Sequence, residues 1–450
     1  MTFETTRSCR RRVLRVATVL LIASPILLAT DADGQDPPPE ADFGNIVKLL
    51  RAGDYVAAEE AASKAEAAIR PASVKDTNYL PRARACIDFL VARAIAARRM
   101  GKLDSAEAAL AEAEERYGDK DFQRTFNQAA RGAGANAMLS LGMVHIEMLD
   151  LRTELALDRF EAAGGDAKAA VLEPLVGRVE QGLQDSASAR QRLAKRLEKA
   201  DPGVLQSTYV RVLAGTTRPS MFAARLATAR ARRTRVDPAK RDGAVALLAT
   251  AATELENGRS SAAEGIAAAL GGPPEAEPQP ADAGAELSEP QQEAALVWAE
   301  LLGCQAETSQ VAGDLPGARK AVERALAFRR SAQRADHPDL VKPLILAAAI
   351  VLDEATAKAA SGPPEATDLA AAADLLESGR RILTSSDRQF DADSPARSRL
   401  AKEVRRLAEA EAAREKLLAG GDAAEAAATR AGESLQAIAT GANPPAADPQ

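Results

Sequence analysis

The sequence predicts an all-α protein, an α-solenoid of stacked helical hairpins. The first observation is composition: 46% of the 450 residues are hydrophobic and 27% are charged, but only 3% are aromatic. Alanine fills much of the remainder, and Ala, Leu, Arg, Glu and Lys lose the least free energy on entering a helix. The second observation is an alanine motif that returns at steps near 50 residues, and the third is a glycine placed just ahead of it.

The motif has a mechanical interpretation. In four stretches a Gly is followed five residues later by an Ala, with small or aliphatic residues four and seven positions beyond. Residues at i, i+4 and i+7 share one helix face, where small side chains let a neighbouring helix approach closely. The preceding Gly suits a tight turn between antiparallel helices. The four pairs are Gly53 and Ala58, Gly101 and Ala106, Gly258 and Ala263, and Gly313 and Ala318.

Three weaker copies extend the series, at Ala156, Ala371 and Ala426. The steps between the seven anchors are 48, 50, 107, 55, 53 and 55 residues. The long step indicates one degenerate unit between Ala163 and Asn257, with helices opened by Asp201-Pro202 and Asp237-Pro238.

Two of these stretches resemble a known family. Gly53 to Ala65 and Gly313 to Ala325 are similar to the turn and second helix of tetratricopeptide repeats, and the His337-Pro338 step resembles the kinesin-light-chain type. The resemblance covers 43–436 and implies a superhelix whose concave face binds a peptide or protein segment. The family unit is about 34 residues, so these units are enlarged. Their first helices lack the family's aromatic signature except at Trp298, and no ligand-contacting residue is carried over.

The N-terminus is typical of a secretory signal peptide. Four arginines among residues 10–15 precede fifteen uncharged residues, 16–30, and small residues allow cleavage after Ala32. The apolar stretch is shorter than a bilayer span and contains Pro25, so we expect only transient membrane contact. We predict export to the periplasm or cell envelope, or secretion. Both the general and the twin-arginine routes stay open.

Composition breaks divide the rest of the chain. Residues 33–42 form a Pro-rich flexible lead-in, and 271–290 carry Pro, Gly and acidic residues without periodicity, which predicts a mobile linker. We therefore expect an N-terminal array over 43–270, a C-terminal array over 291–436 and a disordered tail over 437–450.

Charge and cysteine content limit the function classes. Removing residues 1–32 takes away five Arg and two acidic residues, so the net charge falls from −6 to −9. An acidic chain argues against a general nucleic-acid binder. Two cysteines then remain, Cys86 and Cys304, and we expect two buried thiols instead of a disulfide.

Catalytic and metal motifs are absent from the sequence. His145 sits among apolar residues as an interior side chain, and His337 fits a turn before Pro338. The two His and three Cys form no zinc pattern, Gly132-Ala133-Gly134 lacks the Lys-Ser/Thr of a phosphate loop, and no nucleophile elbow occurs, so we expect no cofactor and no metal. A glycosidase-like pair of carboxylates stays open, because acidic residues are plentiful.

The most distinctive charge feature is a basic run near the end of a predicted helix. Only Asp237 opposes it, in a chain that is otherwise acidic. One interpretation is structural, since basic side chains favour a helix C-terminus. The functional hypothesis is that the run docks an acidic protein segment or an anionic envelope polymer. Its candidate partner-binding residues are Arg225, Arg230, Arg232, Arg233 and Arg235.

Together these features predict an exported, non-catalytic scaffold for protein contacts. Two alternatives remain: a helical-toroid hydrolase or lyase using paired carboxylates, and a self-assembling envelope component. The oligomeric state is left open. An open curved groove is the shape expected of the scaffold, and a closed ring with facing acids is the shape expected of the enzyme.

Overall fold

The structure is a computed structural model that describes residues 43–419, apart from 70–78, 134, 164–166, 198–201, 236–239, 273–276, 282–285, 360–364, 387–388 and 393. The predicted signal peptide, lead-in and C-terminal tail lie outside this range, as does the anchor at Ala426. Across the described ranges, no helix is both long enough and apolar enough to cross a membrane.

The prediction of an all-α protein is confirmed. Within the described residues the chain forms α-helices joined by short loops, and no β-strand occurs there. The helices are α2 (Phe43–Ala52), α3 (Tyr55–Ile69), α4 (Tyr79–Arg99), α5 (Leu103–Gly118), α6 (Lys120–Ala133), α7 (Ala135–Ala162), α8 (Ala169–Leu197), α9 (Pro202–Thr234), α10 (Arg241–Ala269), α11 (Glu289–Ala312), α12 (Leu315–Ala332), α13 (Val341–Ala359), α14 (Ala366–Ser385) and α15 (Pro395–Ala419), with a 3₁₀ helix, η4 (Pro338–Leu340).

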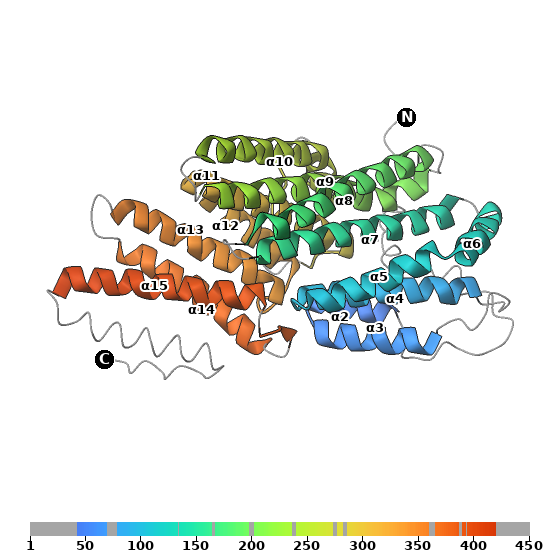
Figure 1. The fold of residues 1–450 in the computed structure, drawn as a ribbon, viewed down its shortest axis with the longest axis horizontal. Coiled ribbons are helices and arrows are strands. Elements are labelled where there is room, and N and C mark those ends of the chain that lie inside the picture. Colours follow the sequence, from blue (N-terminus) through green and yellow to red (C-terminus); the bar gives the residue numbers. More distant parts are fainter. Residues whose placement is uncertain are drawn as a thin grey trace, which may run out of the picture.

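The helices stack as consecutive antiparallel pairs (Figure 1). The pairs are α2 with α3, α4 with α5, α7 with α8, α9 with α10, α11 with α12 and α13 with α14. The first helix of each pair also packs against the first helix of the next, from α4 through α7, α9 and α11 to α13. These five helices therefore form a continuous inner layer, with their partners outside it.

Three of the predicted turn glycines lie where the motif places them. Gly53, Gly101 and Gly313 have φ of 76°, 84° and 89° and sit between paired helices. Such left-handed backbone is cheap only for glycine. The anchors Ala58, Ala106 and Ala318 that follow them are fully buried. Sequence spacing therefore located these hairpins correctly.

Gly258 corrects the same prediction, because it lies inside α10 and not in a turn. A Cβ at this position would stand 3.2 Å from the Ser220 Cβ of α9 and 3.4 Å from a methyl of Leu301 on α11. The glycine thus permits close helix contact. Ala156 likewise lies within one long helix, α7. The long helices α7 to α10, of 28 to 33 residues, occupy the longest step, from Ala156 to Ala263.

The helices on either side of the predicted linker share one hydrophobic cluster. Met221 of α9, Ile266 of α10, Trp298 of α11 and Phe328 of α12 are all buried in it. Glu277, within the linker, forms an ion pair with Arg324. The two predicted arrays therefore pack directly on each other.

The two ends of the array also meet, which differs from the open groove expected from the repeat pattern. The Tyr55 amide donates to Gln389 Oε1 at 3.0 Å, and the Asp391 amide donates to the Met100 carbonyl at 3.2 Å. His337 Nε2 lies 3.1 Å from the Arg51 carbonyl oxygen. Figure 1 shows the first pair, in blue, beside the end of α14. Tyr55 and Arg99 also contact Asp339 of η4. We call all of these contacts between the two ends the closure.

Candidate functional site: the central cavity

A cavity of about 270 Å³, partly open to solvent, lies along the inner helices. Its wall comes from helices that are far apart in the sequence, α4, α7, α9, α11, α12, α13 and α15, together with residues of the loop before α15. Six basic and five acidic side chains line it. They are Arg98, Arg99, Arg225, Arg329, Lys342, Arg399, Asp158, Glu161, Glu300, Glu307 and Asp339.

Water reaches this wall although it lies inside the array. The Arg99 side chain is 39% exposed and that of Lys342 is 50% exposed, yet both belong to the cavity lining. Charged groups that keep contact with water lose less hydration than fully buried ones. The cavity is therefore a solvated, charged interior.

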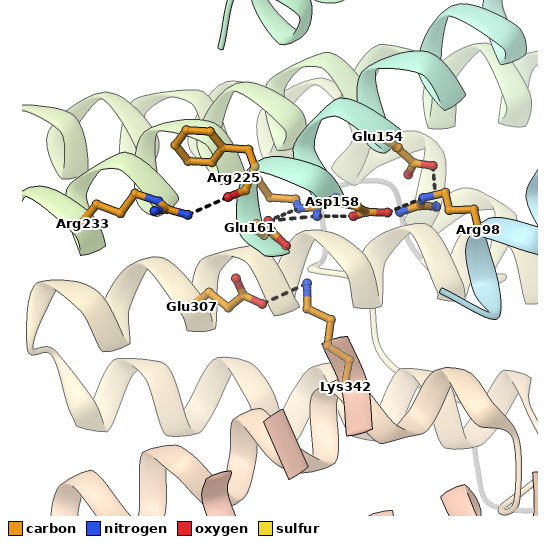
Figure 2. Close-up of polar contacts among 9 residues, drawn as sticks. Arg98, Glu154, Asp158, Glu161, Arg225, Arg233, Glu307 and Lys342 are labelled. Atoms are coloured by element: carbon orange, nitrogen blue, oxygen red, sulfur yellow. Dashed lines mark hydrogen bonds and ion pairs between the residues drawn. The ribbon is translucent and has the colours of Figure 1, made fainter. Parts of the chain in front are cut away.

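One wall is an ion-pair network between α4, α7 and α9 (Figure 2). Arg98 lies 2.6 Å from both Glu154 and Asp158, and Arg225 lies 3.1 Å from Asp158 and 3.0 Å from Glu161. The three acids fall at i, i+4 and i+7, which places them on one face of α7. Burial alone would raise the pKa of Asp158, but Arg98 and Arg225 outweigh it and lower that pKa to about 2. The side chains of this wall are therefore ionised, and the charges of the acids and the arginines largely cancel.

A second wall is the acidic helix α11, which packs against α9. Glu307 is 8% exposed and pairs with Lys342 at 3.1 Å (Figure 2). Burial opposes its charge, but Lys342, Arg399 and neighbouring arginines hold its pKa far below its usual range. Glu300 makes no direct ion pair among the described residues. Burial would raise its pKa, but the surrounding arginines, Arg218 above all, lower it. Both carboxylates are therefore ionised at neutral pH.

Asp339 connects the cavity to the closure. Its carboxylate accepts a hydrogen bond from Tyr55 Oη at 2.6 Å and lies 3.2 Å from Arg99 Nη1. Burial would raise its pKa, but Arg99 and His337 lower it well below the usual range. His337 caps η4 by accepting from the Asp339 amide through Nδ1 at 3.2 Å. The predicted turn role of His337 is thus confirmed, and the same ring also joins α2 to η4.

The inner wall alternates in charge from one helix to the next. The inner face of α4 is basic, that of α7 is acidic, that of α9 is basic and that of α11 is acidic. Lys342 of α13 and Arg399 of α15 are basic again. Opposite charges on neighbouring helices offset the cost of placing so many charges inside the array.

The structure places the five arginines predicted to bind a partner in different surroundings. Arg225 is buried in the α7 network. Arg233 donates to the Phe160 carbonyl at 2.7 Å, and its Cζ lies 4.9 Å from the centre of the Phe160 ring. Arg235 donates to the Val311 carbonyl. Arg230 and Arg232 are exposed, with Glu180 at 3.9 Å from Arg230. Partner binding by any of the five arginines stays a prediction.

The acidic half of the site escaped sequence reasoning, although a signal for it exists. Glu300 and Glu307 lie seven positions apart among apolar residues of α11, and Glu154 and Glu161 are spaced in the same way in α7. Charged residues seven positions apart on an apolar helix face indicate a buried polar stripe. Such a stripe predicts that basic side chains of the same chain pair with it, but the sequence does not say which helix supplies them.

Thiol and metal chemistry find no support in the described residues. Cys86 and Cys304 are both buried and free, as expected. Burial, opposed in part by Arg225, raises the pKa of Cys304 to about 12, so its thiol stays protonated. Within the ranges that the structure describes, no group of three or more His, Cys, Asp or Glu side chains is arranged to hold a metal ion.

Comparison of the chain with protein-family models, with curated proteins and with solved structures finds no match. The architecture of stacked helix pairs therefore rests on the structure alone.

Proposed function

We propose that this protein is an exported, tetratricopeptide-like scaffold that binds a segment of another protein in the cell envelope without transforming it. The observation that supports this function best is the solvated, charge-lined cavity inside the stacked helix pairs. Small-molecule pockets usually run from about 300 to 1,000 Å³ and are mostly apolar. A smaller cavity with a charged wall fits a few polar side chains of a partner better than a drug-sized substrate.

The toroidal enzyme is the main alternative, because the closed array and its internal acids match the shape expected of it. A glycosidase needs one carboxylic acid that stays protonated near neutral pH, which requires a raised pKa. Four of the five described cavity acids, Asp158, Glu300, Glu307 and Asp339, have lowered pKa values. Carboxylates held ionised by arginine are suited to binding and poorly suited to proton donation, which favours the scaffold.

Site-directed photocrosslinking tests the binding function. A photoreactive phenylalanine replaces Phe390, which lines the cavity, in the full-length protein in its own cells. The control carries the same group at Val245, which is 62% exposed on α10. We expect one protein to be crosslinked from position 390 and not from 245. Crosslinks that are absent at 390, or identical at both positions, would contradict a partner in the cavity.

Export is tested separately with a reporter. Residues 1–42 are fused to alkaline phosphatase, which folds to an active form only after export. We expect activity in intact cells, and its absence would place the scaffold elsewhere. Replacing Arg10 and Arg11 by Lys distinguishes the twin-arginine route, which should fail, from the general route, which should continue.

A further inference from the structure

The charge alternation of the inner wall fails at one place, where the array closes on itself. Going around the cavity, each acidic helix lies between two basic ones, from α4 through α7 and α9 to α11. After α11 come three basic groups, on α12, α13 and α15, and the next wall is α4, which is basic again. The Asp391 to Met100 hydrogen bond brings the loop before α15 directly against the end of α4. Two basic walls therefore face the same space.

The cavity-lining acid of the closure, Asp339, already has partners. Asp339 pairs with Arg99 and accepts the Tyr55 hydroxyl. Lys342, on the same side, pairs with Glu307. Among the described acids that line the cavity, Glu300 alone makes no direct ion pair, and it belongs to α11 and not to the closure contacts.

Two guanidinium groups remain there without a direct ion pair. Arg329 and Arg399 both line the cavity, and neither lies in ion-pair contact with a carboxylate of the described residues. Arg329 acts on Asp339 and Glu300 only through longer-range charge interaction, and Arg399 acts on Glu307 in the same way. Both side chains are only partly buried, so an incoming group can reach them.

We propose that an acidic segment of the partner protein fills this junction and that its side-chain carboxylates pair with Arg329 and Arg399. The proposal rests on the scaffold function and names the chemistry of the partner. A guanidinium presents paired donors that match a carboxylate, and such charge-assisted bonds strengthen where water is partly excluded. The segment supplies the acidic stripe that the alternation lacks between α13 and α4. Glu300, which also faces the cavity, repels the same segment and limits its affinity.

The test measures binding of a defined probe to the full-length protein by fluorescence anisotropy. The probe is a fluorescent peptide of alternating Glu and Ala with both ends blocked, and its counterpart carries Gln in place of Glu. We expect the Glu peptide to bind and the Gln peptide to bind at least tenfold more weakly. The double variant R329Q/R399Q should weaken Glu-peptide binding by at least tenfold, and E300Q should strengthen it.

A matched control separates site binding from general charge attraction. R330Q/R405Q removes two positive charges from the same two helices at exposed positions. We expect it to bind like the wild type, with each variant shown to be folded by its helical circular dichroism. Equal weakening by both double variants, or none by R329Q/R399Q, would overturn the proposal. So would failure of the wild type to prefer the Glu peptide.

Two further outcomes identify another occupant or another function. Competition by free succinate at the same concentration as the peptide would show a site for small dicarboxylates and contradict a protein segment. If the crosslinked partner from position 390 is retained by R329Q/R399Q, the scaffold function stands and the acidic-segment proposal fails. If no partner is crosslinked but the Glu peptide binds through these arginines, the scaffold function fails and the site chemistry stands.

Discussion

The closure makes a sharp prediction, because one hydroxyl joins the first helix pair to η4 nearly 300 residues later. Tyr55 is 2% exposed, and its Oη donates to Asp339 at 2.6 Å. Tyr55→Phe removes that donor and leaves the ring in place. A hydrogen bond to a charged acceptor contributes about 1.5–3 kcal/mol. Arg99 still pairs with Asp339, so the carboxylate keeps one cationic partner.

The loss should appear as local opening of α2 and α3. In stacked-repeat proteins terminal units open independently of the rest, so the whole effect falls on the first pair. We expect hydrogen exchange of buried amides in α2 and α3 to speed up by about 10- to 150-fold, which is the same 1.5–3 kcal/mol expressed as an opening constant. Exchange in α9 and α10 should stay the same.

The matched control is Tyr79→Phe. Its hydroxyl donates to Asp119 at 3.4 Å at an exposed site, so the change should cost under about 0.5 kcal/mol. If Tyr55→Phe leaves exchange in α2 and α3 as slow as Tyr79→Phe does, the hydroxyl does not hold the closure. Faster exchange throughout the chain would instead mean that the array opens as one unit.

Three other changes follow from the same contacts. Burial lowers the pKa of His337 below its usual value of 6.5, so His337 binds a proton more readily when the closure is open than when it is closed. Protection of the α2 and α3 amides from hydrogen exchange should therefore fall between about pH 7 and pH 5. Protection that does not change with pH would refute this. Arg225→Ala should lower the free energy of unfolding by about 3 kcal/mol, because it leaves Glu161 without its ion pair. Arg230→Ala, at an exposed site, should lower it by less than about 0.5 kcal/mol. Equal midpoints of urea unfolding for the two variants would show that the network does not stabilise the protein. Gly53→Ala should destabilise the protein by about 1–3 kcal/mol, since the φ of Gly53 is 76° and a Cβ there would stand 2.6 Å from the ring of Pro338. Gly303→Ala should stabilise the protein by about 0.5–1 kcal/mol, because Gly303 lies inside α11 and a Cβ there would meet no other atom within 4 Å. Thermal unfolding that ranks the two variants in the other order would contradict this geometry.

Local features of the chain were predictable from sequence. The hairpin turns at Gly53, Gly101 and Gly313 depend on one backbone conformation and on alanines a turn or two away, so the spacing alone located them. The cap of η4 by His337 is equally local. Gly258 shows where this reasoning fails. A glycine is also used where two helices touch, and only the positions of Ser220 and Leu301 distinguish that use from a turn.

The site was only half predictable for a similar reason. Arg225 stood out in the sequence as part of a basic run, but its partners Asp158 and Glu161 lie more than 60 residues away on α7. Whether such an arginine faces a partner protein or a carboxylate of its own chain depends on which helices become neighbours. Local charge patterns do not carry that information.

Local sequence features are enough to specify alanine-seamed helix pairs, because helix propensity, face periodicity and turn glycines act over a few residues. Closure of the array around a charged cavity depends instead on contacts between helices that are far apart in the chain. The accumulated curvature is the sum of small rotations between all the stacked pairs, and this sum decides whether residues 51–55 reach 334–339.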